Sequence, residues 1–242
     1  LDFETLQELT FTVSVFDGST ISEKDFSLDI QDIDEMTLLT EEQNELISYF
    51  KLLALWKGPS NTPVDFNQKW GSPMKMYLDG SITNDFRATA ENVIAEYNNI
   101  TATGDFTISL TDNQSDANAH VFFGTKNEVE AIWSDMYDII KDKSYDGYAM
   151  TPSQNAVLVS TRIWVSSEYE VLFKHELGHS LGFGHSDRCD AEKSFMCSTI
   201  EIENDILPIE EKVIGYLYHS DMGVGLSESE IDTVLANIML NE

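Results

Sequence analysis

The chain has 242 residues and a formal charge of −29 at pH 7, because 43 Asp and Glu residues outnumber 14 Lys and Arg residues. A surface of this sign repels the backbone of nucleic acids and the headgroups of anionic lipids, so neither is expected to be the main partner. The length suits one large domain, or one domain with a small addition, and no apolar run of about 18 residues predicts a transmembrane segment.

The first 66 residues differ in character from the rest of the chain and are predicted to form a separate N-terminal region. Apolar and polar residues alternate over residues 8–16, which predicts a half-buried strand. Thr40 and Gln43 have the spacing of a capping box, and apolar residues at helical spacing follow, so a helix of about four turns is predicted. The Pro-containing stretch 58–63 ends this helix and is the predicted linker.

After the linker, strand patterns and helix patterns are mixed. The predicted strands are 74–78, 106–110, 119–123, 147–151 and 156–159, and the predicted helices are 85–98, 126–143, 167–181, 208–218 and one that follows the capping box at 227–230. Ser167 and Glu170 have the spacing of a capping box for the helix 167–181. This order predicts an α+β fold, in which helices back a twisted mixed sheet and a small helical C-terminal subdomain follows.

Residues 175–185 read His-Glu-Leu-Gly-His-Ser-Leu-Gly-Phe-Gly-His and are the most informative stretch of the chain. His175 and His179 are four residues apart on a predicted helix, so both imidazoles can reach one ion. His185 can join them only if the chain turns sharply, and Gly182 permits this turn because glycine adopts a left-handed conformation without a side-chain clash. Three neutral imidazoles leave a fourth tetrahedral position open, which is typical of a catalytic zinc site.

Glu176 projects beside such an ion and is the predicted general base, which takes a proton from the attacking water and returns it to the departing amine. A chance His-x-x-x-His pair on an amphipathic helix is the alternative interpretation. That alternative must account for three of the five histidines of the chain, a glutamate and a glycine within one short stretch. His120 and His219 each stand alone and are interpreted as ordinary surface or hydrogen-bonded histidines.

The motif resembles that of the metzincin metallopeptidases, His-Glu-x-x-His-x-x-Gly-x-x-His followed by a methionine turn, for which Met196 is the candidate. Ser186, directly after the third histidine, is similar to the matrixin branch, and a looser resemblance covers residues 67–220. It implies a metzincin-like catalytic domain at residues 67–242, with an active-site helix and one Zn²⁺. Met196 is expected to pack beneath the three histidines without binding the metal. Some metzincins have a tyrosine at the metal two residues after this methionine, but Ser198 occupies that position here.

A peptide or protein substrate is expected to bind in extended form as an added strand, because main-chain pairing accepts almost any sequence. The predicted edge is formed by Gly147, Tyr148, Ala149, Met150 and Thr151. An ordinary edge strand without a substrate role is the alternative interpretation of these five residues.

Cys189 and Cys197 are the only cysteines, and a disulfide between them is predicted, with two buried thiols in a reducing compartment as the alternative. The chain begins at Leu1 without an initiator methionine or a signal peptide. We therefore expect a leader that was removed or left out, and a location outside the cell or in the cell envelope.

Two features depart from the matrixin pattern. Matrixins usually hold a second zinc upstream, and only His120 is available there. Ca²⁺ is also common in them, and residues 112–116 begin like a calcium loop, but Ala117 stands in place of its glycine and Phe123 in place of its closing glutamate. Matrixin propeptides commonly hold the zinc with a cysteine, and none precedes Cys189. If residues 1–66 are a prosegment, another group such as an aspartate would have to cap the zinc; an accessory subdomain is the equal alternative.

The sequence therefore predicts a secreted, zinc-dependent metalloendopeptidase, with a monomer as the expected state. A zinc-binding surface or adhesion module with little turnover is one alternative. Glu176 argues against it, because a binding module has no need of a carboxylate at that position. A narrow-specificity amidase is the other alternative, and its chemistry would be the same.

Overall fold

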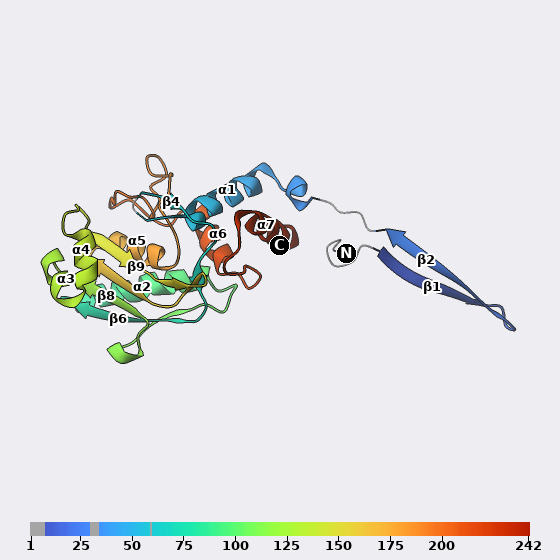
Figure 1. The fold of residues 1–242 in the computed structure, drawn as a ribbon, viewed down its shortest axis with the longest axis horizontal. Helices are drawn as coiled ribbons and strands as arrows, with labels where there is room; N and C mark the ends of the chain where they lie inside the picture. The colour runs from blue at the N-terminus through green and yellow to red at the C-terminus, as the bar shows by residue number, and fades with distance from the viewer. Residues whose placement is uncertain (1–7, 30–33, 59) are drawn as a thin grey trace. The chain divides into compact units, whose positions relative to one another are not determined.

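The computed structural model describes residues 8–29, 34–58 and 60–242, and the chain divides into two compact units, Leu1–Thr40 and Glu41–Glu242 (Figure 1). Residues 1–7 and 30–33 of the predicted N-terminal region, and Pro59 of the predicted linker, lie outside the described residues. The division after Thr40 comes earlier than the boundary predicted at residue 66. Among the described residues, no helix combines the length and the apolar character that crossing a bilayer requires.

The first unit contains an antiparallel hairpin of β1 (Glu8–Phe16) and β2 (Ile21–Asp29), followed by the short helix η1 (Glu35–Leu38). The strand predicted at 8–16 is confirmed, but it is not half-buried: Phe11 and Phe26 stack on each other and remain 44% and 40% exposed. The alternating pattern decides which side chains share a face. Burial of that face needs a second surface, which the pattern cannot supply.

The second unit combines a five-stranded sheet, two small sheets and seven α-helices within the described residues. Its elements in chain order are α1 (Glu41–Leu55), β3 (Trp56–Lys57), β4 (Thr62–Pro63), β5 (Lys69–Trp70), β6 (Met74–Gly80), α2 (Asn84–Ile100), β7 (Ile108–Leu110), η2 (Gln114–Asp116), β8 (Ala119–Phe123), α3 (Lys126–Ile132), α4 (Ser134–Ile140), β9 (Gly147–Met150), β10 (Ser153–Gln154), β11 (Val157–Leu158), β12 (Thr161–Val165), α5 (Glu170–Ser180), α6 (Pro208–Leu217) and α7 (Glu228–Asn241).

The large sheet has the strand order β7-β6-β8-β12-β9. Its first four strands are parallel, and β9 joins β12 in antiparallel orientation at the edge. The mixed sheet of the predicted α+β fold is therefore present, with helices on both faces (Figure 1). The strands β8 and β12 are almost wholly buried, as expected for parallel strands covered on both sides.

Consecutive residues of β8 show which helices cover which face, because side chains alternate along a strand. The ring of Phe123 contacts Phe86 of α2 and Phe173 of α5. The ring of Phe122 belongs to a core cluster on the opposite face with Val129 of α3 and Met136 of α4. The sheet is thus sandwiched between α2 and α5 on one face and α3 and α4 on the other.

The helix prediction for residues 126–143 differs from the structure. The single helix predicted at 126–143 is two short helices, α3 and α4, because Trp133 leaves the helical conformation (φ −139°, ψ 77°). Its ring packs edge-on against Phe122, so tertiary packing interrupts a stretch that contains no proline or glycine. By contrast, the predicted capping box at Ser227 is present, where the serine hydroxyl and backbone N–H both donate to Glu230.

The helix α1 belongs to the second unit. It packs against α6 and α7, and Phe50 and Leu53 on its inner face are 0% and 1% exposed. The sequence analysis assigned this helix to the N-terminal region because a proline-containing stretch follows it. Apolar packing against the C-terminal helices outweighs that local signal.

Candidate metal centre

The helix α5 carries the first half of the histidine motif and begins at Glu170 rather than at the predicted Ser167. The predicted capping box of Ser167 and Glu170 is not formed, because Tyr169 is the N-cap residue of α5 and no side-chain hydrogen bond caps the helix. The neighbouring Glu168 accepts hydrogen bonds from the backbone N–H and the hydroxyl of Thr83, the residue that caps α2. The segment before α5 is therefore linked to a residue that is distant in sequence.

The end of α5 is held by side chains from remote segments. Trp70 Nε1 donates to the carbonyl oxygen of Ser180 (2.8 Å), and the hydroxyl of Tyr218 donates to the carbonyl oxygen of Leu181 (2.9 Å). These bonds satisfy carbonyl groups that a helix end leaves free. Gly182 follows with φ +107°, the left-handed conformation expected for the turn, and a Cβ there would collide with the backbone oxygen of Gln68.

This turn brings together the three predicted ligands. One ring nitrogen of each of His175, His179 and His185 lies within 4.8 Å of the others. The Nδ1 atoms of His175 and His179 each lie 2.8 Å from a carbonyl oxygen, of Phe195 and Phe183 respectively. Because a carbonyl can only accept, Nδ1 carries the proton in both rings, and Nε2 keeps the lone pair that a metal needs.

Burial keeps the three imidazoles neutral. It lowers the pKa of His175 to about 4, that of His179 well below its usual range, and that of His185 in the same direction. A neutral imidazole is the form that binds a metal, so the site needs no deprotonation at pH 7.

Glu176 lies beside the triad with 4% of its surface exposed, and its Oε2 is buried without a hydrogen-bond partner among the described residues. Burial raises the pKa of this carboxyl group to about 8. Gly147 of β9 lies against it, so closely that a Cβ at residue 147 would come within 2.5 Å of Oε1. The sequence pattern indicated Gly147 only as part of the substrate edge, and this contact with Glu176 was not predicted.

The segment around Met196 connects both halves of the motif. Met196 is fully buried, and a Cβ at Gly178 of α5 would come within 2.5 Å of its Sδ. The carbonyl oxygen of Met196 accepts a hydrogen bond from the N–H of Ser186, which is next to His185. The carbonyl oxygen of the preceding residue, Phe195, accepts one from Nδ1 of His175. The disulfide between Cys189 and Cys197 is formed and closes the loop between His185 and this segment.

A buried hydrogen-bond network supports the third histidine from behind. The hydroxyl of Tyr49 in α1 lies 2.6 Å from that of Ser186 and donates to Glu210 Oε1 of α6 (2.7 Å). Ser194 also donates to Glu210, and burial raises the pKa of this carboxyl group. No sequence pattern marked Tyr49 or Glu210, because the three segments meet only in the folded chain.

The predicted linker at 58–63 is a wall of the site. The carbonyl oxygen of Leu53 accepts from the N–H of Gly184 (2.7 Å), and Asn61 exchanges two hydrogen bonds with the backbone of His185 (3.2 and 3.4 Å). A Cβ at Gly184 would collide with the carbonyl oxygen of Trp56. The segment of β3 and β4 is therefore packed against the turn that carries the third histidine.

The triad opens into a cavity of about 630 Å³. Four of the five predicted edge residues line it, namely Gly147, Tyr148, Ala149 and Thr151. Met150 does not, and packs instead against the cluster on the other face of the sheet. Among the described strands, β9 pairs only with β12. The other edge of β9 is therefore free to pair with a further strand.

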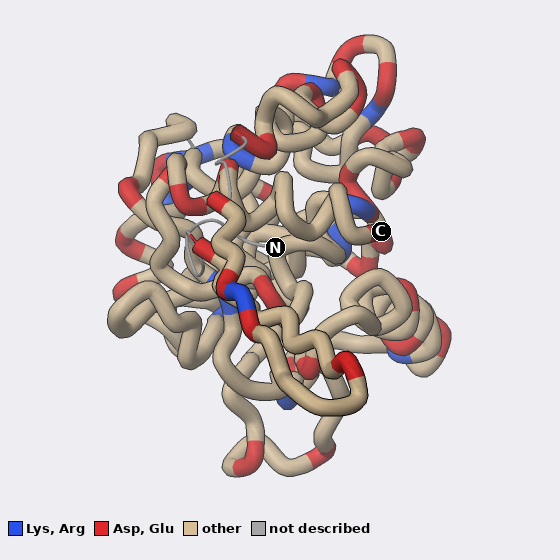
Figure 2. Tube along the Cα trace, turned by 90° about the vertical axis from the view of Figure 1, so that its right-hand side faces the viewer, with Lys and Arg blue, Asp and Glu red and all other residues tan. Residues whose placement is uncertain are grey.

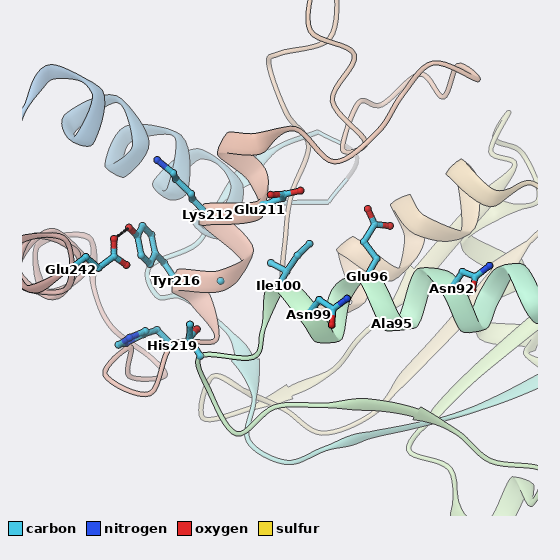
Figure 3. Close-up of a pocket in the computed structure, with 12 residues that line it drawn as sticks. Asn92, Ala95, Glu96, Asn99, Ile100, Glu211, Lys212, Tyr216, His219 and Glu242 are labelled. Carbon is cyan, nitrogen blue, oxygen red and sulfur yellow. Dashed lines mark hydrogen bonds between the residues drawn. The ribbon is translucent and has the colours of Figure 1, made fainter.

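A second cavity, of about 730 Å³, lies between α2 and α6 (Figure 3). Its carboxylates include Glu96 and Glu242, and the latter accepts a hydrogen bond from Tyr216 (2.9 Å). These side chains are not close enough to one another to share a metal ion. Among the described residues, the histidine triad is the one cluster of three or more His, Cys, Asp or Glu side chains that is close enough.

Replacing Gly182 with alanine is expected to destabilise the protein by roughly 1–3 kcal/mol and to weaken zinc binding, because the Cβ would be strained and would displace the turn before His185. Urea unfolding and zinc titration measure the two effects. Gly225→Ala is the matched control, since Gly225 also has a positive φ (+74°) but its Cβ would meet only Ala156 at an ordinary 3.4 Å. Equal zinc affinity of the two variants would contradict the role of the turn.

No model of a known protein family matches the sequence, and no curated protein is similar to it. Among solved structures, two of myroilysin resemble the chain with a TM-score of 0.40 and 12% identity; one match covers 62% of this chain and 95% of that one, and the other covers 74% and 97%. Similarity at this level supports no conclusion about fold or function. The metzincin resemblance and its matrixin branch stay predictions from the motif.

Proposed function

We propose that this protein is a zinc-dependent metallopeptidase that cleaves peptide bonds within extended chains. One observation carries the proposal: three neutral imidazoles, of which that of His175 is buried and the other two are half-buried, converge next to a buried carboxylate that has no hydrogen-bond partner among the described residues. Buried polar groups are normally paired, so an unpaired carboxylate beside a set of metal ligands indicates a catalytic role.

The residues present fit zinc. Imidazole nitrogen is a preferred ligand of Zn²⁺, whereas Ca²⁺ and Mg²⁺ prefer sets of oxygen ligands. His175, His179 and His185 would hold the ion and leave a position open for water or substrate. When bound, zinc supplies a Lewis acid that acidifies water to a pKa of about 7 and polarises a carbonyl group.

Glu176 is the proposed general base. Next to a cation the carboxylate form is favoured, since an opposite charge lowers the pKa of an acid. In that form Glu176 accepts a proton from the attacking water and returns it to the amine, which leaves as a neutral group. The absence of a side chain at Gly147 allows β9 to lie close to this carboxylate.

The substrate is proposed to pair with the free edge of β9. An extended peptide there would place its backbone in the cavity that Tyr148, Ala149 and Thr151 line. Backbone pairing along an edge favours cleavage inside a chain, because neither terminus is needed for binding. A location outside the cytosol belongs to the same proposal, since a disulfide persists in oxidising compartments.

A zinc-binding module without turnover is the second candidate. Against it, a carboxylate buried without a partner lowers stability and contributes nothing to binding zinc through three imidazoles. An amidase acting on a non-protein substrate would use the same residues and differs only in what the cavity accepts.

Incubation of the zinc-loaded protein with a diverse peptide library, analysed by mass spectrometry, tests the proposal. We expect cleavage that a chelator abolishes and that added zinc restores, with one zinc per chain by metal analysis. Tight binding of one zinc without cleavage of any peptide would contradict a peptidase and favour the binding module or the amidase.

A further inference from the structure

The cavity of the triad is lined by a lysine that the proposed mechanism does not use. Lys57 of β3 lines this cavity, and its Nζ atom is buried without a hydrogen-bond partner among the described residues. It also interacts electrostatically with His179, whose pKa it helps to lower. The hairpin of β3 and β4, packed against the backbone of His185, holds it in place.

An unpaired buried ammonium group is unusual in this chain. Acidic residues outnumber basic ones three to one and are spread along the whole trace, so partners are abundant (Figure 2). Lys174, whose side chain is buried, is paired with Glu96 (3.0 Å) and Asp205 (2.6 Å). Lys57 makes no such ion pair within the described part of the chain, and burial lowers its pKa to about 7.

The cavity itself holds no counterion for Lys57. Its carboxylates are those of Glu176 and Asp146, and neither forms a hydrogen bond or an ion pair with Nζ. A buried charge is costly unless it is paired, and the pairing can come from a ligand. A carboxylate that enters the cavity would form a charge-assisted hydrogen bond with Nζ, while the acidic surface elsewhere on the chain would repel it.

We propose that Lys57 is a specificity-determining residue that binds a carboxylate of the substrate, which makes this protein selective for peptides with an acidic group close to the scissile bond. This inference rests on the proposed function, because it concerns the substrate of the same site. The carboxylate is either an Asp or Glu side chain or the C-terminus of the peptide.

Matched peptides test the proposal on the zinc-loaded protein. One series exchanges Glu for Gln at each position around the scissile bond found in the library experiment, and a second exchanges a free C-terminus for an amide. We expect kcat/KM to be roughly tenfold or more higher for the acid at one position, mainly through KM. An effect of the side chain identifies Asp or Glu as the source, and an effect of the terminus identifies a C-terminal carboxylate.

The variant Lys57→Met keeps most of the length of the unbranched side chain and removes the amine, and it is expected to reduce the ratio of acid to amide cleavage to about one. Lys57→Arg is expected to keep part of the preference. Lys75→Met, which alters an exposed lysine outside the cavity, is the control and should leave both the activity and the ratio unchanged. Circular dichroism and zinc content check that each variant is folded.

Three outcomes would overturn the proposal. They are cleavage by the wild type without any preference for an acid, a preference that persists in Lys57→Met, and a loss of zinc affinity in Lys57→Met, which would make Lys57 a metal ligand instead. If no peptide is cleaved, the proposed function fails on its own account. Binding of the Glu and Gln peptides to the zinc-loaded Glu176→Gln variant then still decides whether Lys57 selects a carboxylate.

Discussion

Replacing Glu176 with glutamine is expected to abolish peptide hydrolysis and, at the same time, to make the metal-free protein more stable at neutral pH. Loss of the general base should lower kcat by a factor of about 10²–10⁴, because glutamine cannot accept the proton of the attacking water. The gain in stability has a separate cause, which is the cost of ionising a carboxyl group that is buried without a partner.

The sign of the stability change follows from the pKa of Glu176. Its folded-state value of about 8 lies above the ordinary 4.5, so the folded protein binds this proton more tightly than the unfolded chain does. Stability therefore falls as the pH rises from 4.5 to 8, and glutamine, which resembles the protonated acid, avoids the loss. The variant should gain nothing below pH 4.5 and roughly 3 kcal/mol at pH 7.

Urea unfolding of the metal-free proteins between pH 4 and pH 8, together with a peptidase assay of the zinc-loaded forms, measures both effects. Glu130→Gln, which alters an exposed glutamate of α3, is the control and should change neither quantity. Hydrolysis within tenfold of the wild type would exclude Glu176 as the base. A stability difference that does not depend on pH would show that its carboxyl group is not buried as described.

Removing residues 1–40 is expected to leave a folded protein that binds zinc, whereas removing residues 1–66 should unfold it. The longer deletion takes away α1, of which Leu46, Ile47, Phe50, Leu53 and Leu55 are buried. Burial of such side chains contributes about 1.5–3 kcal/mol each, so the five together approach the roughly 5–15 kcal/mol that stabilises a whole domain. The deletion also removes Tyr49 and Asn61, which support the segment around His185.

Thermal melts followed by circular dichroism, with zinc content of the purified proteins, compare the two deletions. A folded, zinc-binding protein without residues 1–66 would show that α1 is dispensable, as a prosegment would be. The shorter deletion addresses the remaining part of the prosegment hypothesis. An increase in peptidase activity after removal of residues 1–40 would support an inhibitory role, and unchanged activity would favour an accessory unit.

The histidine motif was predictable because its geometry is local. His175 and His179 share a face of one helix, and Gly182 adopts the positive φ that the turn to His185 requires. These relations involve residues a few positions apart, so helical periodicity and the conformational freedom of glycine are enough to infer them. The capping box at Ser227 was predictable for the same reason.

Only the tertiary structure decided which remote segments complete the site. The capping box predicted at Ser167 and Glu170 is absent, Trp133 interrupts the helix predicted at 126–143, and the predicted linker at 58–63 packs against the turn before His185. Two further features likewise depend on chain segments more than 25 residues away. Glu176 is buried against Gly147, and the unpaired Nζ of Lys57 is held by packing against the turn at residues 183–185. The sequence by itself determined the proposed metal ligands, because a helix and a turn suffice to bring the three histidines together. Burial and ion pairing, on which the protonation and the proposed selectivity of the site rest, depend on long-range packing that no local pattern records.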